Sequence, residues 1–309
     1  MLSNWVTDHF ERSGLEYPFQ AIQPMLKNAD VRFCNLENPI GTADSTFRTE
    51  KTYTFALAPK YRDALTDAHF DIVNLANNHI LDFGTHLADS TMYYLNALGI
   101  RTVGYGQNSM AAAGPVIFSK DDLAVGFLGY SMTFPREFWA TDSSAGTAYP
   151  DTHNFIDQIK SLNDQVDFTV VSFHWGAENS DSTKAYQQVF AHRAIDAGAD
   201  LIIGHHPHVW QGLETYKNRL IAYSLGNLCF GSFSPTAIES GLLEVQAGHD
   251  TIYSAKIFPL NVKNVDVRFQ PQPMDTVNAN HFFRELRRYS ARFDTISTLQ
   301  IQNDGELIW

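Results

Sequence analysis

The feature that most constrains this chain is a regular alternation of short apolar runs with segments of helical period. Continuous apolar runs are typical of buried strands, and apolar residues recurring every three or four positions are typical of helices that cover a sheet. We predict strands at residues 31–36, 72–75, 102–103, 116–118, 124–130, 168–173, 201–203, 213–216, 220–223, 241–245 and 253–258. We predict helices at residues 19–26, 61–68, 87–98, 154–162, 184–197 and 279–290. This order predicts one two-layered α/β body that ends in antiparallel sheet.

Composition narrows the classes of function. The 309 residues carry a formal net charge of -12 and no basic run, so we expect no nucleic-acid partner. No apolar run approaches the roughly 18 to 20 residues that a membrane-spanning helix needs. The first ten residues, MLSNWVTDHF, lack the basic segment followed by an apolar segment that is typical of a signal peptide. For the chain as written we therefore expect a cytoplasmic location.

Polar clusters follow four of the predicted strands. In α/β sheets the carboxyl ends of the strands line the crevice where ligands bind. The four clusters therefore predict one convergent site. The clusters comprise Asn35 and Glu37, then Asn77, Asn78, His79 and Asp82, then His174, and finally His205, His206 and His208.

The most specific cluster is GHHPHVWQ at residues 204–211. His206 and His208 flank Pro207, which fixes its own φ and biases the preceding residue toward extended backbone. Two imidazoles held in this way suit a transition-metal ion. A hydrogen-bonded loop of histidines is the alternative, but three histidines directly after an apolar strand favour the metal.

The other clusters are less specific. His79 follows two asparagines in NLANNHILDFG, and its imidazole could deliver a proton to a leaving group, although a polar loop needs no function. Glu37 follows a buried strand, where a carboxylate needs a positive partner. That partner is either an arginine, such as Arg32 or Arg48, or a metal ion, and the sequence leaves both open. His174, at the end of a predicted strand, is by itself weak evidence for a functional site.

Five motifs in this order resemble the CapA family, which is associated with poly-γ-glutamate capsule synthesis. They are NLE at residues 35–37, NNHxxDxG at 77–84, HWG at 174–176, GxHPHVxQ at 204–211 and YSLGN at 223–227. The resemblance runs from about Pro18 to the C-terminus. It therefore implies an N-terminal segment, residues 1–17, without family resemblance and one CapA-like domain, residues 18–309.

The family in turn is similar to the calcineurin-like metallophosphoesterases, which implies a four-layer αββα sandwich with a two-metal site. By that likeness Glu37 is the bridging carboxylate, and His79, together with Asp82, is the general acid or transition-state stabiliser. The resemblance implies metal ligation by Glu37, Asn78, His174, His206 and His208, and substrate binding by Asn35, Asn77, His205 and Asn227. Mixed nitrogen and oxygen ligands fit manganese, iron or zinc.

The sequence departs from the family at its start. Family members open with an apolar strand ending in Gly-Asp, whose aspartate serves the first metal, and residues 1–17 contain Asp8 and His9 but no apolar run before them. We expect the fold to lack its first strand and the site to lack that aspartate, unless the start of the chain is misassigned. The same segment would carry any membrane anchor, and family members are often anchored or extracytoplasmic.

Three functions follow from these features. The first is metal-dependent hydrolysis of a phosphoester or of a γ-glutamyl amide. The second is an accessory role, in which the fold binds the anionic polymer poly-γ-glutamate or capsule synthase subunits without turnover. The third is a truncated, inactive homologue.

Overall fold

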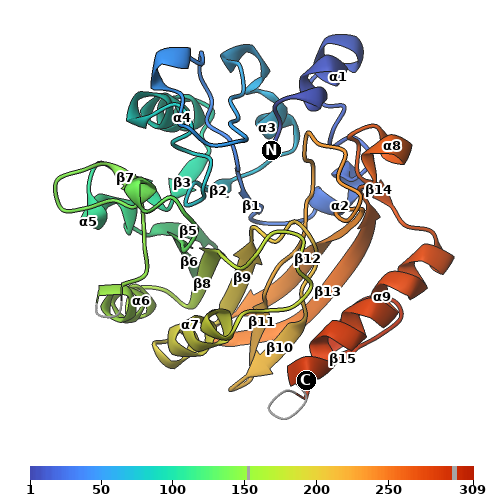
Figure 1. Ribbon diagram of the computed structural model, residues 1–309. Coiled ribbons are helices and arrows are strands. Elements are labelled where there is room, and N and C mark those ends of the chain that lie inside the picture. Colours follow the sequence, from blue (N-terminus) through green and yellow to red (C-terminus); the bar gives the residue numbers. More distant parts are fainter. Residues whose placement is uncertain (152–153, 294–297) are drawn as a thin grey trace.

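One of the two β layers of the molecule is a mixed sheet of six strands, in the order β10-β11-β9-β8-β6-β5 (Figure 1). The computed structural model describes residues 1–151, 154–293 and 298–309. The inner strands β6, β8, β9 and β11 are parallel, and β5 and β10 pair antiparallel at the two edges. The strands are β5 (Val116–Lys120), β6 (Leu123–Ser131), β8 (Phe168–His174), β9 (Leu201–His205), β10 (Leu213–Tyr216) and β11 (Arg219–Ala222). All seven residues of β8 are buried, which explains its continuous apolar run.

The second β layer consists of two separate sheets. A parallel sheet has the order β1-β2-β3, and an antiparallel sheet has the order β12-β13-β16-β15, with β14 paired to β13. Their strands are β1 (Phe33–Asn35), β2 (Ile72–Asn74), β3 (Arg101–Val103), β12 (Glu239–Gly248), β13 (Thr251–Asn261), β14 (Gln272–Pro273), β15 (Gln300–Ile301) and β16 (Glu306–Ile308). A small pair, β4 (Tyr105–Gly106) with β7 (Gly146–Thr147), lies apart from both.

Helices cover the outer faces of both layers. Side chains of α6 and α7 pack on the outer face of the six-stranded sheet, and those of α1 to α4 pack on the parallel sheet. The helices are α1 (Trp5–Ser13), α2 (Gln23–Leu26), α3 (Ala64–Asp67), α4 (Thr85–Ala97), α5 (Ser109–Ala112), α6 (Asn154–Asn163), α7 (Ala185–Asp196), α8 (Asn264–Val267) and α9 (Thr276–Ser290). Strand β2 has two buried faces. Ile72 packs against the other β layer, and the next residue, Val73, packs against the helices. The predicted αββα order is confirmed.

Some elements were not predicted. Helix α1 forms near the N-terminus and buries Val6 and Phe10 in the same core as α2 to α4. The segment predicted as a helix over residues 61–68 is α-helical only at α3, and the short strands β15 and β16 had no periodic signal. In the described part of the chain, no helix has the length and apolar character needed to span a bilayer.

The strand registers bring the polar clusters to one edge. Asn35, the last residue of β1, is opposite Asn74, the last residue of β2. In the facing sheet, His174 at the end of β8 is opposite His205 at the end of β9. Parallel strands thus present both pairs at their carboxyl ends, as the sequence predicted.

Gly204 in β9 allows the closest backbone approach near this edge. A Cβ atom added there would lie 1.8 Å from the carbonyl oxygen of Tyr223 and 2.7 Å from Nε1 of Trp175. That indole already donates a hydrogen bond of 2.9 Å to the same carbonyl. The glycine that opens the GHHPH motif is therefore required by packing.

We predict that Gly204→Ala lowers the free energy of unfolding by about 3 kcal/mol, because two buried main chains must separate. Gly114→Ala is the control, since its Cβ would meet one atom, at 3.1 Å. It should change stability by less than about 1 kcal/mol. Urea denaturation measures both, and equal losses would show that β9 does not need the glycine.

Candidate metal centre

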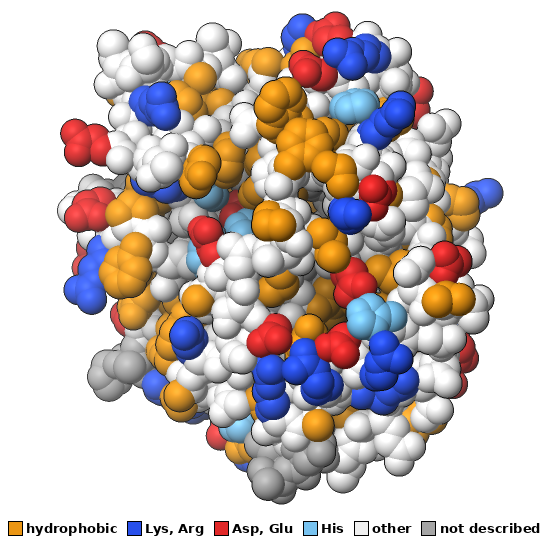
Figure 2. Space-filling view, turned by 45° about the vertical axis from the view of Figure 1, so that its right-hand side comes forward, with side chains coloured by type: hydrophobic (Ala, Val, Ile, Leu, Met, Phe, Trp, Pro, Cys, Tyr) orange, Lys and Arg blue, Asp and Glu red, His pale blue; other side chains and the backbone are white. Residues whose placement is uncertain are grey.

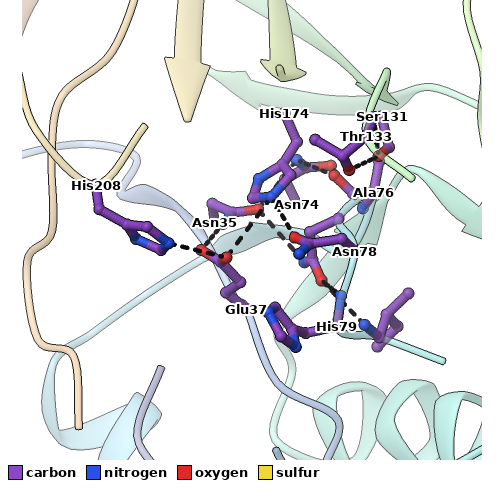
Figure 3. Close-up of polar contacts among 12 residues, drawn as sticks. Asn35, Glu37, Asn74, Ala76, Asn78, His79, Ser131, Thr133, His174 and His208 are labelled. Atoms are coloured by element: carbon purple, nitrogen blue, oxygen red, sulfur yellow. Dashed lines mark hydrogen bonds and ion pairs between the residues drawn. The ribbon is translucent and has the colours of Figure 1, made fainter. Parts of the chain in front are cut away.

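The Glu37 carboxylate occupies the centre of the site (Figure 3). The residue is only 5% exposed. Its Oε2 accepts a hydrogen bond of 3.3 Å from the Asn35 amide, whereas its buried Oε1 has no hydrogen-bond partner among the described residues. Oε1 lies 3.7 Å from Nε2 of His174 and 3.9 Å from Nε2 of His208. A buried carboxylate oxygen in this setting requires a cation.

The arginines considered as partners for Glu37 do not approach it. Arg32 pairs with Asp71 at 3.2 Å and donates to the carbonyl oxygens of Leu26 and Lys27. Arg48 is exposed. The side chains that approach the Glu37 carboxylate are histidines, so the arginine alternative is wrong for the described residues.

His174 and Asn78 approach Glu37 from the ends of two different strands. Nε2 of His174 lies 2.8 Å from Oδ1 of Asn78. His174 is 0% exposed, and its Nδ1 has no partner among the described residues. Two ligand atoms of one transition-metal ion are separated by about 3 Å, because each bond is about 2.0 to 2.2 Å long. The pair therefore fits one metal ion without rearrangement.

His206 and His208 form a second group beside Glu37. One ligand atom from each of the three side chains lies within 4.8 Å of the others. The sequence predicted an extended backbone at His206, and this is wrong, because His206 has a φ of 97° and His208 a φ of 63°. Non-glycine residues in this region are strained by about 1 to 3 kcal/mol each and cluster at functional sites. With this backbone, both imidazoles each bring one nitrogen into the group around Glu37.

Asn227 fixes the tautomer of His208. Nδ1 of His208 lies 2.9 Å from Oδ1 of Asn227. An amide oxygen can only accept, so Nδ1 carries the proton and Nε2 faces Glu37 with its lone pair available. Asn227, predicted to bind substrate, thus orients the imidazole of His208.

His79 belongs to a separate triad beside the centre. Its Nδ1 donates to Oδ2 of Asp82 at 2.7 Å, and Lys51 contacts Oδ1 of Asp82 at 2.6 Å. Lys51 also donates to the carbonyl oxygen of Asn78. Asp82 is completely buried, so Lys51 supplies its countercharge. Sequence reasoning missed Lys51, which lies in the long connection between β1 and β2 and has no motif around it.

Three asparagines hold the two loops together beneath Glu37. Oδ1 of Asn35 accepts from the amides of Asn74 at 3.3 Å and Asn77 at 3.4 Å. Oδ1 of Asn77 accepts from the main-chain N–H groups of His79 and Ile80, each at 3.0 Å. These bonds fix the position of the loop that carries Asn78 and His79.

Two cavities adjoin the centre. The smaller has a volume of about 480 Å³ and is lined by Asn78, Thr133, Glu178, Lys184, Tyr186 and His206, among others. The larger is lined by Glu37, His205 and His206 at one end. His205 does not join the ligand group; its ring lies 6.3 Å from that of Phe33, and its buried Nε2 has no partner among the described residues.

Burial disfavours the protonated form of three histidines in and beside this centre, namely His174, His205 and His206. Desolvation lowers the pKa of His205 and of His206 to about 3, and the neighbouring His208 adds to the effect at His206. Desolvation, followed by the nearby histidines, also holds the pKa of His174 well below its ordinary value. Neutral imidazoles at neutral pH keep the lone pairs that metal binding needs.

We predict that the metal-free protein loses stability as the pH falls from about 6.5 toward 3. A histidine with a pKa near 3 in the fold and near 6.5 when unfolded binds its proton mainly in the unfolded state. Each such group contributes a slope of up to about 1.4 kcal/mol per pH unit. Urea unfolding in a chelator at pH 7 and pH 5 measures this loss, which should be smaller for His205→Gln and unchanged for the exposed His69→Asn. A stability that stays constant over this interval would contradict the prediction.

A second prediction concerns the countercharge of Asp82. Lys51→Met leaves a buried carboxylate without its lysine, and we expect a loss of about 3 kcal/mol in unfolding free energy. Lys60→Met removes an exposed ion pair with Glu11 and serves as the control, with a much smaller expected loss, because solvent screens this pair. Equal losses in the two variants would mean that Lys51 does not stabilise Asp82.

Comparisons with known proteins agree with this geometry. The family model described as "Bacterial capsule synthesis protein PGA_cap" matches residues 1–232. The capsule biosynthesis protein CapA of Bacillus anthracis is 28% identical, over 94% of this chain and 72% of that protein. The PGA biosynthesis protein CapA of Bacillus subtilis is 26% identical, over 94% and 76%. A probable polyglutamine synthesis accessory protein of Mycobacterium tuberculosis is 28% identical, over 90% and 79%.

Solved structures with low sequence identity share the fold. A putative 5'-nucleotidase from Staphylococcus aureus superposes with a TM-score of 0.51 at 14% identity, covering 89% of this chain and 53% of that one. A hypothetical protein from Thermus thermophilus superposes with a TM-score of 0.50 at 14% identity, covering 80% and 94%. The chain therefore shares its architecture with these two proteins.

Proposed function

The chain belongs to the bacterial capsule synthesis protein family PGA_cap, and from this premise we propose that it is a metal-dependent hydrolase of poly-γ-glutamate capsule production. The bond cleaved is a γ-glutamyl amide of the polymer or a phosphoester. The observation that carries the proposal is the buried Oε1 of Glu37, which lies between His174 and His208 with no hydrogen-bond donor in the described structure.

Five side chains would hold the metal. Glu37 serves both groups of ligands, with Asn78 and His174 on one side and His206 and His208 on the other. The donors are neutral imidazoles, an amide oxygen and a carboxylate, which suit divalent manganese, iron or zinc. The family aspartate for the first metal has no counterpart in this ligand group, and Asp8 lies exposed on α1. We therefore propose that the His206 and His208 side binds metal more tightly.

The metal would supply a nucleophile at neutral pH, because it lowers the pKa of bound water, and it would polarise the bond to be cleaved. The protein residues do the remaining work. Nδ1 of His79 donates to Asp82, so its Nε2 would take the proton that the attacking water loses and pass it to the leaving amine or alcohol. Lys51 holds the Asp82 carboxylate in position through its ion pair of 2.6 Å. We assign Asn35, Asn77 and Asn227 to positioning these groups.

The smaller cavity is the proposed substrate site. Asn78 and His206 line it from the metal centre, and the exposed residues Glu178 and Lys184 line its outer part. Lys184 could pair with a carboxylate of poly-γ-glutamate or with a phosphate. His205 faces the other cavity, so we leave it out of the substrate site.

The test is hydrolysis by purified protein loaded with Mn²⁺, Fe²⁺ or Zn²⁺. Substrates are oligo-γ-glutamate and p-nitrophenyl phosphate, which separate amide from phosphoester cleavage. We expect His206→Ala to lose bound metal by elemental analysis. We expect His79→Ala to keep its metal and to lose about 100-fold or more in kcat. His69→Ala, an exposed histidine, should match the unaltered protein. Turnover that is the same in all three variants would reject the hydrolase.

A non-catalytic accessory role is the second proposal, because the mycobacterial relative is named an accessory protein. It predicts that metal-loaded protein binds poly-γ-glutamate or a capsule synthase subunit without cleaving the polymer. The formal net charge of -12 opposes binding of an anionic polymer, so binding should depend on the metal. Titration calorimetry with and without chelator, together with chain-length analysis of the polymer, distinguishes the two roles.

A further inference from the structure

The smaller cavity beside the metal centre presents one positive and one negative side chain to its contents. Lys184 and Glu178 line its outer part, and neither forms an ion pair with another described side chain. The other residues that line this cavity are neutral at pH 7, and His206 is among them because its pKa is about 3. A bound group can therefore meet a cation and an anion that have no other ion-pair partner in the described structure.

The loop that carries both charges is fixed to the metal-binding loop after β9. The main-chain N–H of Asn179 donates a hydrogen bond of 2.8 Å to the carbonyl oxygen of Pro207, which stands between the two histidines of the second ligand group. The amide of Gln211 donates to the carbonyl oxygens of Ser180 at 2.9 Å and Ser182 at 3.2 Å. These bonds keep the loop at a set position relative to the metal ligands.

Two buried glutamines also determine the position of Lys184. Oε1 of Gln211 accepts a hydrogen bond of 3.0 Å from the amide of Gln187, and Oε1 of Gln187 accepts one of 2.7 Å from the main-chain N–H of Lys184. Both glutamines are 0% exposed. Gln211 is the last residue of the GHHPHVWQ motif, so this motif supplies two imidazoles and also a positioning residue for the cavity. The charged rim is therefore a built part of the site.

An α-amino acid group carries the two charges that this rim complements. Its carboxylate would pair with Lys184 and its ammonium group with Glu178, in charge-assisted hydrogen bonds. In a γ-glutamyl residue, three bonds of roughly 1.5 Å separate the γ-carbonyl carbon from the α-carbon, so the two atoms are about 4 Å apart. A residue with its γ-carbonyl at the metal centre thus extends its α-amino acid group into the cavity. The volume of about 480 Å³ is within the usual range for small ligands.

Poly-γ-glutamate has such a group at one position. In the interior of the polymer each α-nitrogen is acylated, so an interior residue has a negative carboxylate and no positive charge. The residue at the amino end has both a carboxylate and an ammonium group. Glu178 repels interior segments and attracts this end. Acidic and basic side chains are interspersed on the face that Figure 2 draws, so this face offers no purely basic groove to a polyanion.

We propose that the smaller cavity binds the amino-terminal residue of a γ-glutamyl chain, with Lys184 at its α-carboxylate and Glu178 at its α-ammonium group. This inference rests on the hydrolase proposed above and specifies which bond it cuts. The hydroxyl group of one water molecule joins the first γ-carbonyl carbon, the C–N bond breaks, and the remaining proton goes to the leaving nitrogen.

The products are then free glutamate and a chain shorter by one residue. The nitrogen released is the α-nitrogen of the next residue, so the shortened chain again has an α-ammonium group at its end. Each product chain is therefore a new substrate for the same cavity. Degradation proceeds from the amino end, one residue at a time.

Three acyl p-nitroanilides test the recognition of the two charges. Their acyl groups are γ-glutamyl, used as both enantiomers, glutaryl, which lacks the ammonium group, and 4-aminobutyryl, which lacks the carboxylate. Titration calorimetry on the metal-loaded His79→Ala protein measures their binding while turnover is suppressed. We expect one γ-glutamyl enantiomer to bind about tenfold or more tightly than either of the other two probes, because each loses one charged hydrogen bond.

Charge-removing variants test the location. In the same background, Glu178→Gln should bind the γ-glutamyl and glutaryl probes equally, and Lys184→Met should bind the γ-glutamyl and 4-aminobutyryl probes equally. Glu16→Gln and Lys160→Met remove exposed charges outside the cavity and should keep the original order of affinity. Thermal denaturation checks that each variant folds. An unchanged order in both cavity variants, equal binding of the three probes, or no binding of the γ-glutamyl probe would overturn the proposal.

Oligo-γ-glutamate with an acetylated amino end separates this proposal from the hydrolase itself. We expect the otherwise unaltered, metal-loaded protein to shorten the free oligomer one residue at a time and to leave the acetylated oligomer intact. Cleavage of the acetylated oligomer at interior bonds would overturn recognition of the amino end and retain the hydrolase. Selective binding of the γ-glutamyl probe without cleavage of any oligomer would retain the recognition site and reject the hydrolase.

Discussion

The structure depends on one buried carboxylate that the protein does not neutralise by hydrogen bonding. Oε1 of Glu37 is shielded from water and has two imidazoles at 3.7 and 3.9 Å, but no donor within hydrogen-bond distance among the described residues. Burying such a group costs several kcal/mol unless a cation accompanies it. His174 and His206 cannot supply that cation at neutral pH, because burial lowers the pKa of His206 to about 3 and holds that of His174 well below its ordinary value. A metal ion resolves both requirements at once.

The surrounding residues fix the orientation of the side chains in the site. Asn227 sets the tautomer of His208, and Asp82 sets that of His79, so that each ring presents Nε2 to the site. Asn77 closes the loop that carries Asn78 and His79. The site combines polar side chains at and after the ends of β1, β2, β8 and β9, and parallel pairing keeps the ends of these strands in fixed register within each sheet. The arrangement is therefore a product of two facing sheets and not of any single loop.

Sequence patterns predicted the inner strands and the clusters at their ends, because an apolar run such as β8 followed by His174 is a local signal. They did not predict contacts between segments that are distant in the sequence and carry no motif. Lys51 is the clearest case, since its ion pair with Asp82 can be recognised only in the folded chain. The positive φ of His206 was also missed, because tertiary contacts override the local preference of a residue before proline. Helix α1 was overlooked because only Val6 and Phe10 mark its buried face.

Strand β1 links the candidate metal centre to the gap between the two sheets of the second layer. This strand has three residues and one paired edge, yet Asn35 at its end contacts Glu37 and two neighbouring asparagines. A short strand paired on one side is weakly held, because edge strands carry half the hydrogen bonds of central ones. The position of the carboxylate therefore depends on what lies against the other edge of β1.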